Sequence, residues 1–216
     1  MTDTIQTVKT TCSRFTMGHS QADKAASRER ILAEAAAQIR ASGIDALSVG
    51  PLMRSVGLTH GGFYGHFESR ADLLAQALQR ALADGAATSS FAPDATGQAP
   101  PYPTAVRRYL SRAHRDEPAT GCALAALAAD VARADDASRA VMSAQIGRLA
   151  DGLAPGLASD EPGEALFAVS AMVGALLVSR VLVDRGQSDA LLQAARRHLL
   201  ALGADAAGRQ GTDNPG

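Results

Sequence analysis

One segment constrains the fold of this chain more than any other: residues 47–74, with the sequence LSVGPLMRSVGLTHGGFYGHFESRADLL. Ser48 is a favourable helix N-cap, and Gly57 can adopt the left-handed conformation that ends a helix. Thr59 is a second N-cap and predicts another short helix over about 60–66. Two short helices joined by a glycine-containing turn make a helix-turn-helix, whose second helix enters the major groove of DNA.

An aromatic cluster follows this turn, in the order Phe63, Tyr64, Gly65, His66 and Phe67, and Ser69 and Arg70 then begin a capped helix. With these features, residues 27–74 resemble the TetR family of bacterial repressors, which carries an aromatic-Tyr-x-His-Phe signature at the end of its recognition helix. The resemblance implies an all-α protein of about nine helices. It would have an N-terminal three-helix domain with the helix-turn-helix and a C-terminal helical domain that binds a ligand and dimerises.

The expected DNA contacts are Ser48, Thr59, His60, Gly61, Gly62, Tyr64, His66 and Arg70. Tyr64 and His66 can donate to phosphate oxygens, a contact that fixes register without reading sequence. Phe63 and Phe67 are expected to pack in the core. Arg70 lies in a first helical turn, where the helix dipole disfavours a cation, so a phosphate partner is expected. The alternative is an ordinary surface arginine.

The start of the second helix departs from the family pattern. Many members have a basic residue where this chain has His60, and a larger residue where it has Gly65. The two glycines after His60 permit a close approach to DNA but offer no side chain to base edges. Base readout is therefore expected from Thr59, His60 and Tyr64.

The amino-acid composition favours one class of fold but does not identify a binding partner. The chain has 216 residues, a formal net charge of -1, 4% aromatic residues and no Trp. Few aromatics among many alanines and leucines favour an all-helical fold over a β-sandwich. Residues 1–72 hold eight basic and seven acidic residues, so charge alone does not indicate a nucleic-acid partner.

Cysteine usage and hydropathy indicate a cytoplasmic location and no membrane partner. Cys12 and Cys122 are too few for a disulfide framework and fit a reducing compartment. The N-terminal segment lacks the apolar stretch of a signal peptide. The longest apolar run, residues 165–178, is shorter than a membrane span and predicts a buried helix.

Apolar periodicity and turn residues divide the chain into four parts. The parts are a disordered tail over 1–21, in which Met17 offers an alternative start, a helix-turn-helix domain over 22–69, an effector-binding and dimerisation domain over 70–203, and a disordered tail over 204–216. Helices are predicted over about 23–42, 70–87, 104–113, 122–133, 136–153, 162–184 and 188–202. Gly186 is expected to end the penultimate helix and Ser188 to cap the last.

The predicted helix over 162–184 is apolar on nearly every face, so it must be covered on more than one side. We expect a homodimer in which the last two helices of each chain form a four-helix bundle. A helix buried inside a monomer is the alternative. The expected interface residues are Leu166, Ala171, Gly174, Leu177, Val178, Val181, Leu192 and Leu199.

The resemblance implies a largely apolar effector pocket in the second domain. Candidate pocket residues are Tyr109, His114, Cys122, Phe167 and Met172. An effector would alter the separation of two recognition helices that must lie about 34–36 Å apart on DNA. The expected partners are double-stranded operator DNA and an unidentified small molecule, and the expected function is a repressor that this molecule releases from its operator.

Two other functions compete with this one. Cys122 lies at the expected N-terminus of a helix, a position that stabilises a thiolate, so a regulator that senses electrophiles or oxidants is one alternative. A buried, inert thiol is the competing interpretation of this residue. A helical protein without a DNA role would leave the aromatic cluster unexplained. We find no GxSxG, HExxH, P-loop or GxGxxG motif, and predict no catalytic residue, metal or cofactor.

Overall fold

The computed structural model describes residues 21–87, 91–92, 95, 97–117, 122–161 and 163–203. Every named element in this part is helical, which confirms the all-α prediction. The elements are α1 (Gln21–Ser42), η1 (Ile44–Ala46), α2 (Val49–Ser55), η2 (His60–Gly65), α3 (Arg70–Ala87), α4 (Tyr102–Tyr109), α5 (Arg112–Asp116), α6 (Ala123–Val131), α7 (Asp136–Leu153), η3 (Ala154–Gly156), α8 (Glu164–Val181) and α9 (Arg185–Ala201). Cys12 and nearly all of both expected tails lie outside the described residues.

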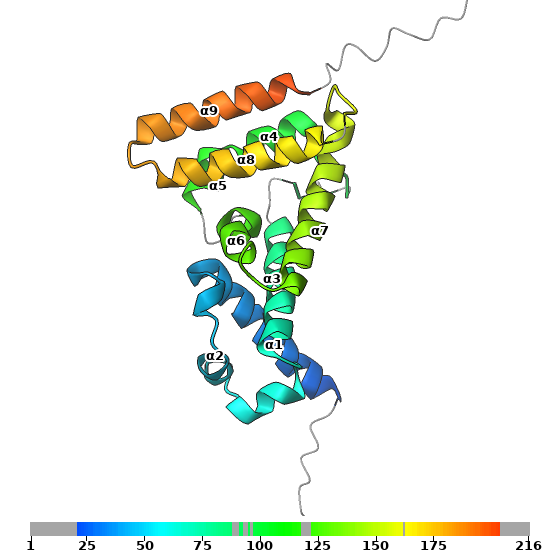
Figure 1. The fold of residues 1–216 in the computed structure, drawn as a ribbon, viewed down its shortest axis with the longest axis vertical. Helices are drawn as coiled ribbons and strands as arrows, with labels where there is room; N and C mark the ends of the chain where they lie inside the picture. Colours follow the sequence, from blue (N-terminus) through cyan, green and yellow to red (C-terminus); the bar gives the residue numbers. More distant parts are fainter. Residues whose placement is uncertain are drawn as a thin grey trace, which may run out of the picture.

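The N-terminal helices form a small lobe at one end of an elongated molecule (Figure 1). Its core includes Ile31 and Ile39 of α1, Leu52 of α2 and Phe63 of η2, all at most 1% exposed. Gly57 has a φ of 74° after α2, which confirms the predicted left-handed turn. The helix α3 leaves this lobe and packs against α7, so it joins the lobe to the C-terminal helices.

The predicted second helix of the helix-turn-helix is a 3₁₀ helix, η2, rather than an α-helix. Three of its six residues are glycine, and glycine lacks the propensity that sustains α-helical turns. The predicted cap is confirmed, because the Thr59 hydroxyl accepts a hydrogen bond from the Gly62 N–H at 3.3 Å. Ser48 occupies the N-cap position of α2, but its side chain makes no capping hydrogen bond.

Two helix boundaries in the C-terminal part were predicted wrongly. The single helix expected over 104–113 is two helices, α4 and α5, because Ser111 starts a new one by accepting from the His114 N–H at 3.1 Å. Gly186 does not end α8, and Ser188 does not cap α9. The α9 cap is Asp184, whose carboxylate accepts from the Gln187 N–H at 2.6 Å.

The helix α8 leaves part of its apolar surface uncovered. Its exposed large side chains form a row that we call the α8 stripe: Leu166, Phe167, Leu177, Val178 and Val181, each 44–73% exposed. The other side of α8 packs against α7, α9 and α6. Its length and composition would also let it cross a bilayer, a test that core helices of soluble proteins pass as well.

The structure corrects three predicted residue placements around this stripe. Leu192 and Leu199 of α9 are each 2% exposed within one chain, so they offer almost no surface to a second copy. Their side of α9 is taken by α8 and α4 of the same chain. Phe167 belongs to the exposed α8 stripe, at 58% exposed, and not to an internal pocket.

Candidate nucleic-acid interface and effector cavity

The outer surface of η2 is polar and open. Among the predicted DNA contacts, Thr59, His60, Gly61, Gly62 and Tyr64 are all exposed. Tyr64 is 71% exposed although it is aromatic, and its ring meets the Phe63 ring edge-on. Exposed aromatic side chains next to polar groups are typical of surfaces that bind a partner.

The two phenylalanines hold η2 from below. Phe63 is 1% and Phe67 2% exposed, as predicted, and their rings stack at a centroid distance of 5.6 Å. The Arg28 guanidinium of α1 lies over the Phe67 ring at 4.9 Å. The buried pair therefore fixes η2 against α1, and leaves the opposite face of η2 free to meet a ligand.

Gly61 and Gly65 of η2 are not required by packing within the chain. A Cβ added at Gly61 or Gly65 would meet no atom within 4 Å. Neither residue has a positive φ, so neither needs glycine's conformational freedom. Small residues at these exposed positions keep the backbone accessible to a partner outside the protein.

His66 lies at the edge of this surface and is half-buried. Its Nδ1 is buried and has no hydrogen-bond partner within the described chain. Burial, with Lys24 and Arg28 nearby, lowers the pKa of the His66 imidazole below its ordinary value. The neutral ring retains one N–H that can donate.

Arg70 holds the helix-turn-helix in place. Its Nε and Nη2 donate to the Leu47 carbonyl oxygen at 3.2 and 3.1 Å, and Nη2 also donates to the Ile44 carbonyl oxygen at 3.2 Å. These bonds tie the start of α3 to the turn before α2. The phosphate contact expected of Arg70 remains a prediction, and intramolecular bonds already explain the presence of a cation here.

The same turn is tied to the C-terminal helices from its other side. The Asp130 carboxylate, near the end of α6, accepts a hydrogen bond from the Ile44 N–H at 3.3 Å. Gly43 has a φ of 81°, and a Cβ there would lie 2.7 Å from an Asp130 oxygen. The contact links α6 directly to the segment that precedes α2.

Two basic residues near this surface were not among the predicted contacts. Lys24 is exposed on α1 and lies close enough to His66 to lower its pKa. Arg54 is exposed in the last turn of α2. A cation on the first helix of a helix-turn-helix is a signal that could have identified Arg54, because that helix crosses the DNA backbone.

A small apolar cavity, too narrow to hold a water molecule, lies in the C-terminal helices. Its lining includes Tyr109 and Met172, two of the five predicted effector contacts. The prediction missed the other lining residues, which are Phe91, Leu149, Val169 and Val173. Phe91 is an aromatic residue in a segment of small residues, which was a usable signal. The cavity is smaller than most small-molecule sites, so an effector would have to enlarge it.

Tyr109, His114 and Cys122 lie together beside this cavity. The Tyr109 and His114 rings meet edge-on at 4.6 Å. The Tyr109 hydroxyl is buried without a hydrogen-bond partner among the described residues. Burial, with Cys122 as the second cause, raises the pKa of Tyr109 well above its ordinary value. The cluster thus holds an unsatisfied hydroxyl beside a half-buried thiol.

His114 bonds at both ring nitrogens and must be neutral to do so. Nδ1 lies 2.8 Å from the Tyr109 carbonyl oxygen, and Nε2 lies 3.2 Å from the Cys122 backbone nitrogen. The carbonyl requires a proton on Nδ1, and the Cys122 N–H requires a free lone pair on Nε2. Burial, with Arg180 contributing, lowers the pKa of His114 below 6.5, although its bond to Tyr109 opposes this shift.

We therefore expect the stability of the protein to fall as the pH drops from 7.5 to 5.5. The unfolded chain binds the His114 proton more tightly than the folded chain, so acid favours unfolding. The contribution is complete above the unfolded pKa and is lost as the pH falls through the folded one. Urea unfolding at several pH values measures it. His114→Gln should make the profile less steep, with the share of His66 remaining, whereas His198→Gln, at an exposed position, should leave it as in wild type. Equal profiles for both variants would contradict this role.

The sequence of the N-terminal lobe also matches a known protein family. A family model described as bacterial regulatory proteins, tetR family, matches residues 31–77. The matched range runs from α1 into α3 and includes the whole exposed surface of η2. No curated protein sequence matches the chain at a significant level.

Several solved structures have a similar fold, and each match covers most of this chain. The reduced form of NemR from E. coli has a TM-score of 0.60 and 22% identity, and the match covers 84% of this chain and 99% of NemR. A TetR-family transcriptional regulator from Cytophaga hutchinsonii has a TM-score of 0.62 and 18% identity, with 84% and 97% covered. TylP, a TetR regulator from Streptomyces fradiae, has a TM-score of 0.56 and 22% identity, with 85% and 89% covered.

Proposed function

Since the chain belongs to the TetR family of bacterial regulatory proteins, we propose that it is a cytoplasmic repressor which a small-molecule effector releases from operator DNA. The family consists of DNA-binding transcriptional regulators that form homodimers and are not enzymes. Residues 22–69 would bind DNA, and residues 70–203 would bind the effector and the second copy. The observation that carries this proposal is the exposed surface of η2, where polar and small residues lie over a buried phenylalanine pair.

The DNA contacts divide into two kinds. Tyr64 and His66 would donate to phosphate oxygens, with Lys24 and Arg54 adding positive charge near the backbone. Thr59 and His60 would reach base edges at the start of η2, and the flanking glycines would let the backbone approach the groove. This division predicts different effects for variants of the two groups.

We expect Tyr64→Ala to weaken binding across all DNA sequences, and His60→Ala to reduce discrimination between operator and unrelated DNA. A lost base contact costs about 1–3 kcal/mol of discrimination, roughly 5- to 150-fold. Gel shifts with the DNA flanking the gene, at two salt concentrations, measure both quantities. Tyr64→Phe separates the hydroxyl from the ring, and Arg148→Ala, an exposed cation on α7, is the control. Unchanged binding by both alanine variants would remove η2 as the DNA contact.

The route from effector to DNA would run along α6. Its N-terminus begins at Cys122, beside Tyr109 and the apolar cavity. Its other end carries Asp130, which bonds to Ile44 in the turn before α2. An effector that enlarges the cavity would displace α6, and the Asp130 contact would pass that displacement to the helix-turn-helix. A shift of a few ångströms would spoil the spacing of two recognition helices on DNA.

The cluster around Cys122 supports a second candidate function, a regulator that responds to electrophiles. The thiol is half-buried and free, and it lies beside the unpaired Tyr109 hydroxyl at the start of the helix that leads to Asp130. A covalent adduct on this sulfur would need room, and would push α6 away from Tyr109. The same displacement that an apolar effector causes would then follow from a chemical modification.

Treatment with N-ethylmaleimide distinguishes the two candidates. If Cys122 is the sensor, the reagent should release wild-type protein from DNA and leave Cys122→Ser bound. Mass spectrometry of the peptide that contains Cys122 shows whether the sulfur was modified, which separates this thiol from Cys12. Modified protein that still binds DNA would rule out thiol sensing and leave the apolar effector as the remaining candidate.

A further inference from the structure

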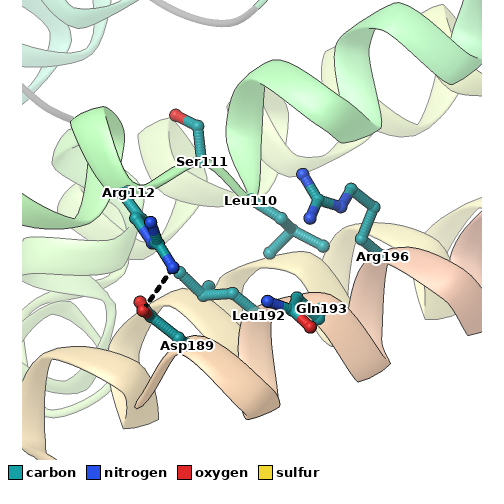
Figure 2. A pocket seen from close by; sticks show the side chains of 7 residues that line it. All are labelled: Leu110, Ser111, Arg112, Asp189, Leu192, Gln193 and Arg196. Carbon is teal, nitrogen blue, oxygen red and sulfur yellow. Dashed lines mark ion pairs between the residues drawn. The ribbon is translucent and has the colours of Figure 1, made fainter. Parts of the chain in front are cut away.

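A groove of about 390 Å³ lies between the α4–α5 junction and α9, and it shares no residue with the apolar cavity. Its sides carry Arg112 and Arg196, with Leu110 and Leu192 between them (Figure 2). Asp189 and Arg196 are seven residues apart on α9, so both face the groove from the same side of the helix. Its volume lies in the range of small-molecule sites.

The arginines of this groove have unused hydrogen-bonding capacity. Within the described chain, Arg196 makes no hydrogen bond and no ion pair, although it is half-buried. Arg112 uses one nitrogen, Nη2, which lies 2.6 Å from an Asp189 oxygen. The Ser111 oxygen accepts from the His114 N–H, so its own hydrogen is free to donate into the groove.

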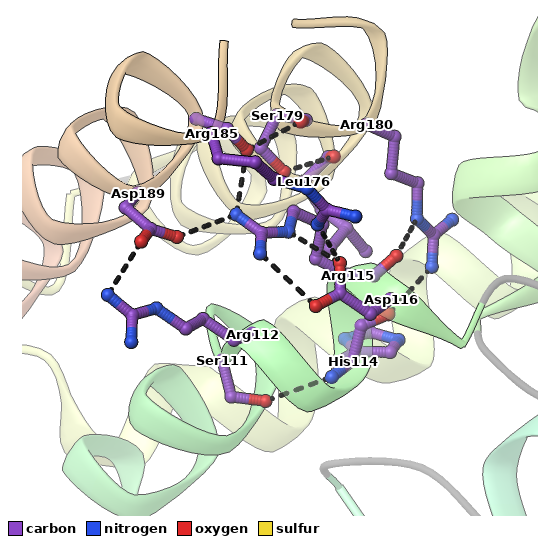
Figure 3. Close-up of polar contacts among 11 residues, drawn as sticks. Ser111, Arg112, His114, Arg115, Asp116, Leu176, Ser179, Arg180, Arg185 and Asp189 are labelled. Carbon is purple, nitrogen blue, oxygen red and sulfur yellow. Dashed lines mark hydrogen bonds and ion pairs between the residues drawn. The ribbon is translucent and has the colours of Figure 1, made fainter. Parts of the chain in front are cut away.

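The one acidic residue of the groove cannot neutralise both arginines. The other oxygen of Asp189 accepts from Arg115 Nη1 at 2.7 Å, and Arg115 is 5% exposed (Figure 3). Hydrogen bonds from Arg115 and Arg112 keep the pKa of Asp189 below its ordinary value, so it remains ionised. Its charge is thus shared by two guanidinium groups, and the charge of Arg196 is uncompensated.

We propose that this groove binds a small organic molecule that carries one carboxylate. The planar guanidinium of Arg196 matches a carboxylate with two parallel N–H donors, and Leu110 and Leu192, 1% and 2% exposed, give the groove a narrow apolar floor. A single uncompensated charge favours a monoanion over a phosphate dianion, which the Asp189 carboxylate would repel more strongly than a monoanion. The site does not depend on the proposed repression, because it lies apart from η2 and from the apolar cavity.

Binding of 4-fluorobenzoate to the full-length protein tests the proposal, by fluorine NMR and calorimetry. We expect 4-fluorobenzoate to bind, and its uncharged amide, 4-fluorobenzamide, to bind at least tenfold more weakly. Arg196→Gln should lower the affinity for the carboxylate about tenfold or more, because a hydrogen bond to a charged group is lost. Arg196→Lys should fall between the two, since it keeps the charge without the planar fork.

The adjacent Arg197 gives a matched control. It is exposed on α9 and does not line the groove, so Arg197→Gln should bind 4-fluorobenzoate as wild type does. Circular dichroism checks that each variant is folded. Equal affinity in Arg196→Gln, no binding to wild type at millimolar ligand, or displacement by an equal concentration of inorganic phosphate would each overturn the proposal.

Discussion

Replacing Val178 with glutamate is expected to convert the proposed homodimer into a monomer and to weaken its proposed binding to operator DNA more than about 100-fold. Val178 lies on the α8 stripe and is 49% exposed in one chain. If this stripe packs against its copy, each dimer would bury two unpaired carboxylates, and burying an unpaired charge costs several kcal/mol. A monomer would engage one half-site and make half of the phosphate contacts, so its affinity would approach that of non-specific binding.

Small residues of α8, between the large side chains of the stripe, leave room for a second helix to pack against it. A Cβ added at Gly174 would meet no atom within 4 Å of its own chain, and Ala171 nearby is only partly buried. Small residues between larger apolar ones allow two helices to approach closely. We therefore propose that Leu166, Ala171, Gly174, Leu177, Val178 and Val181 meet the partner chain, with Phe167 added and the buried Leu192 and Leu199 removed.

Sedimentation velocity at micromolar protein measures the change in mass. Ala144→Glu adds the same charge to an exposed face of α7, outside the stripe, and should remain a dimer. Gel shifts on the same samples report operator binding. Val178→Glu that sediments as a dimer would remove the α8 stripe from the interface. A monomer that kept full operator affinity would instead separate dimerisation from DNA binding.

Apolar periodicity and local caps predicted most helices of this fold. The predicted ranges 70–87 and 136–153 agree with α3 and α7, because such helices combine long apolar faces with clear ends. The α8–α9 turn was predicted wrongly because two competing caps lie four residues apart. Ser188 is buried and donates to the Ser179 carbonyl oxygen, so a tertiary contact uses the hydroxyl that was expected to cap α9. Asp184 caps it instead.

The candidate sites were predictable where local sequence determines exposure. Phe63 is buried and the adjacent Tyr64 exposed because they point to opposite sides of η2, and Phe67, just after η2, is buried against Phe63. The bonds of Arg70 join residues 23 and 26 positions apart, a separation that no local pattern reveals. Likewise, the apolar side of α9 could face its own chain or a partner. Only the folded chain shows that Leu192 faces inward.

Replacing Gly156 with alanine is expected to destabilise the protein by about 1–3 kcal/mol or more, because the site is already filled. The added Cβ would lie 2.2 Å from the Tyr102 Cβ and 3.4 Å from the Tyr102 Cα. The Tyr102 Cβ is bonded to the main chain, so no side-chain rotation relieves the clash and η3 must move away from α4. The adjacent Leu157 pairs with Gly203 in an isolated antiparallel bridge, so the movement would also disturb the end of α9.

Tyr102 cannot move aside, because a hydrogen bond to α9 and the close approach of Gly203 restrict its side chain. Its hydroxyl donates to the Leu199 carbonyl oxygen at 2.8 Å, and burial, with a smaller effect of Glu164, raises its pKa to about 12. A Cβ at Gly203 would lie 3.1 Å from the same ring. Urea unfolding measures the loss. Gly152→Ala, in α7 with open space around its Cβ, should instead stabilise by about 0.5–1 kcal/mol. If both variants shift the unfolding midpoint alike, steric contact at Tyr102 does not explain the glycine.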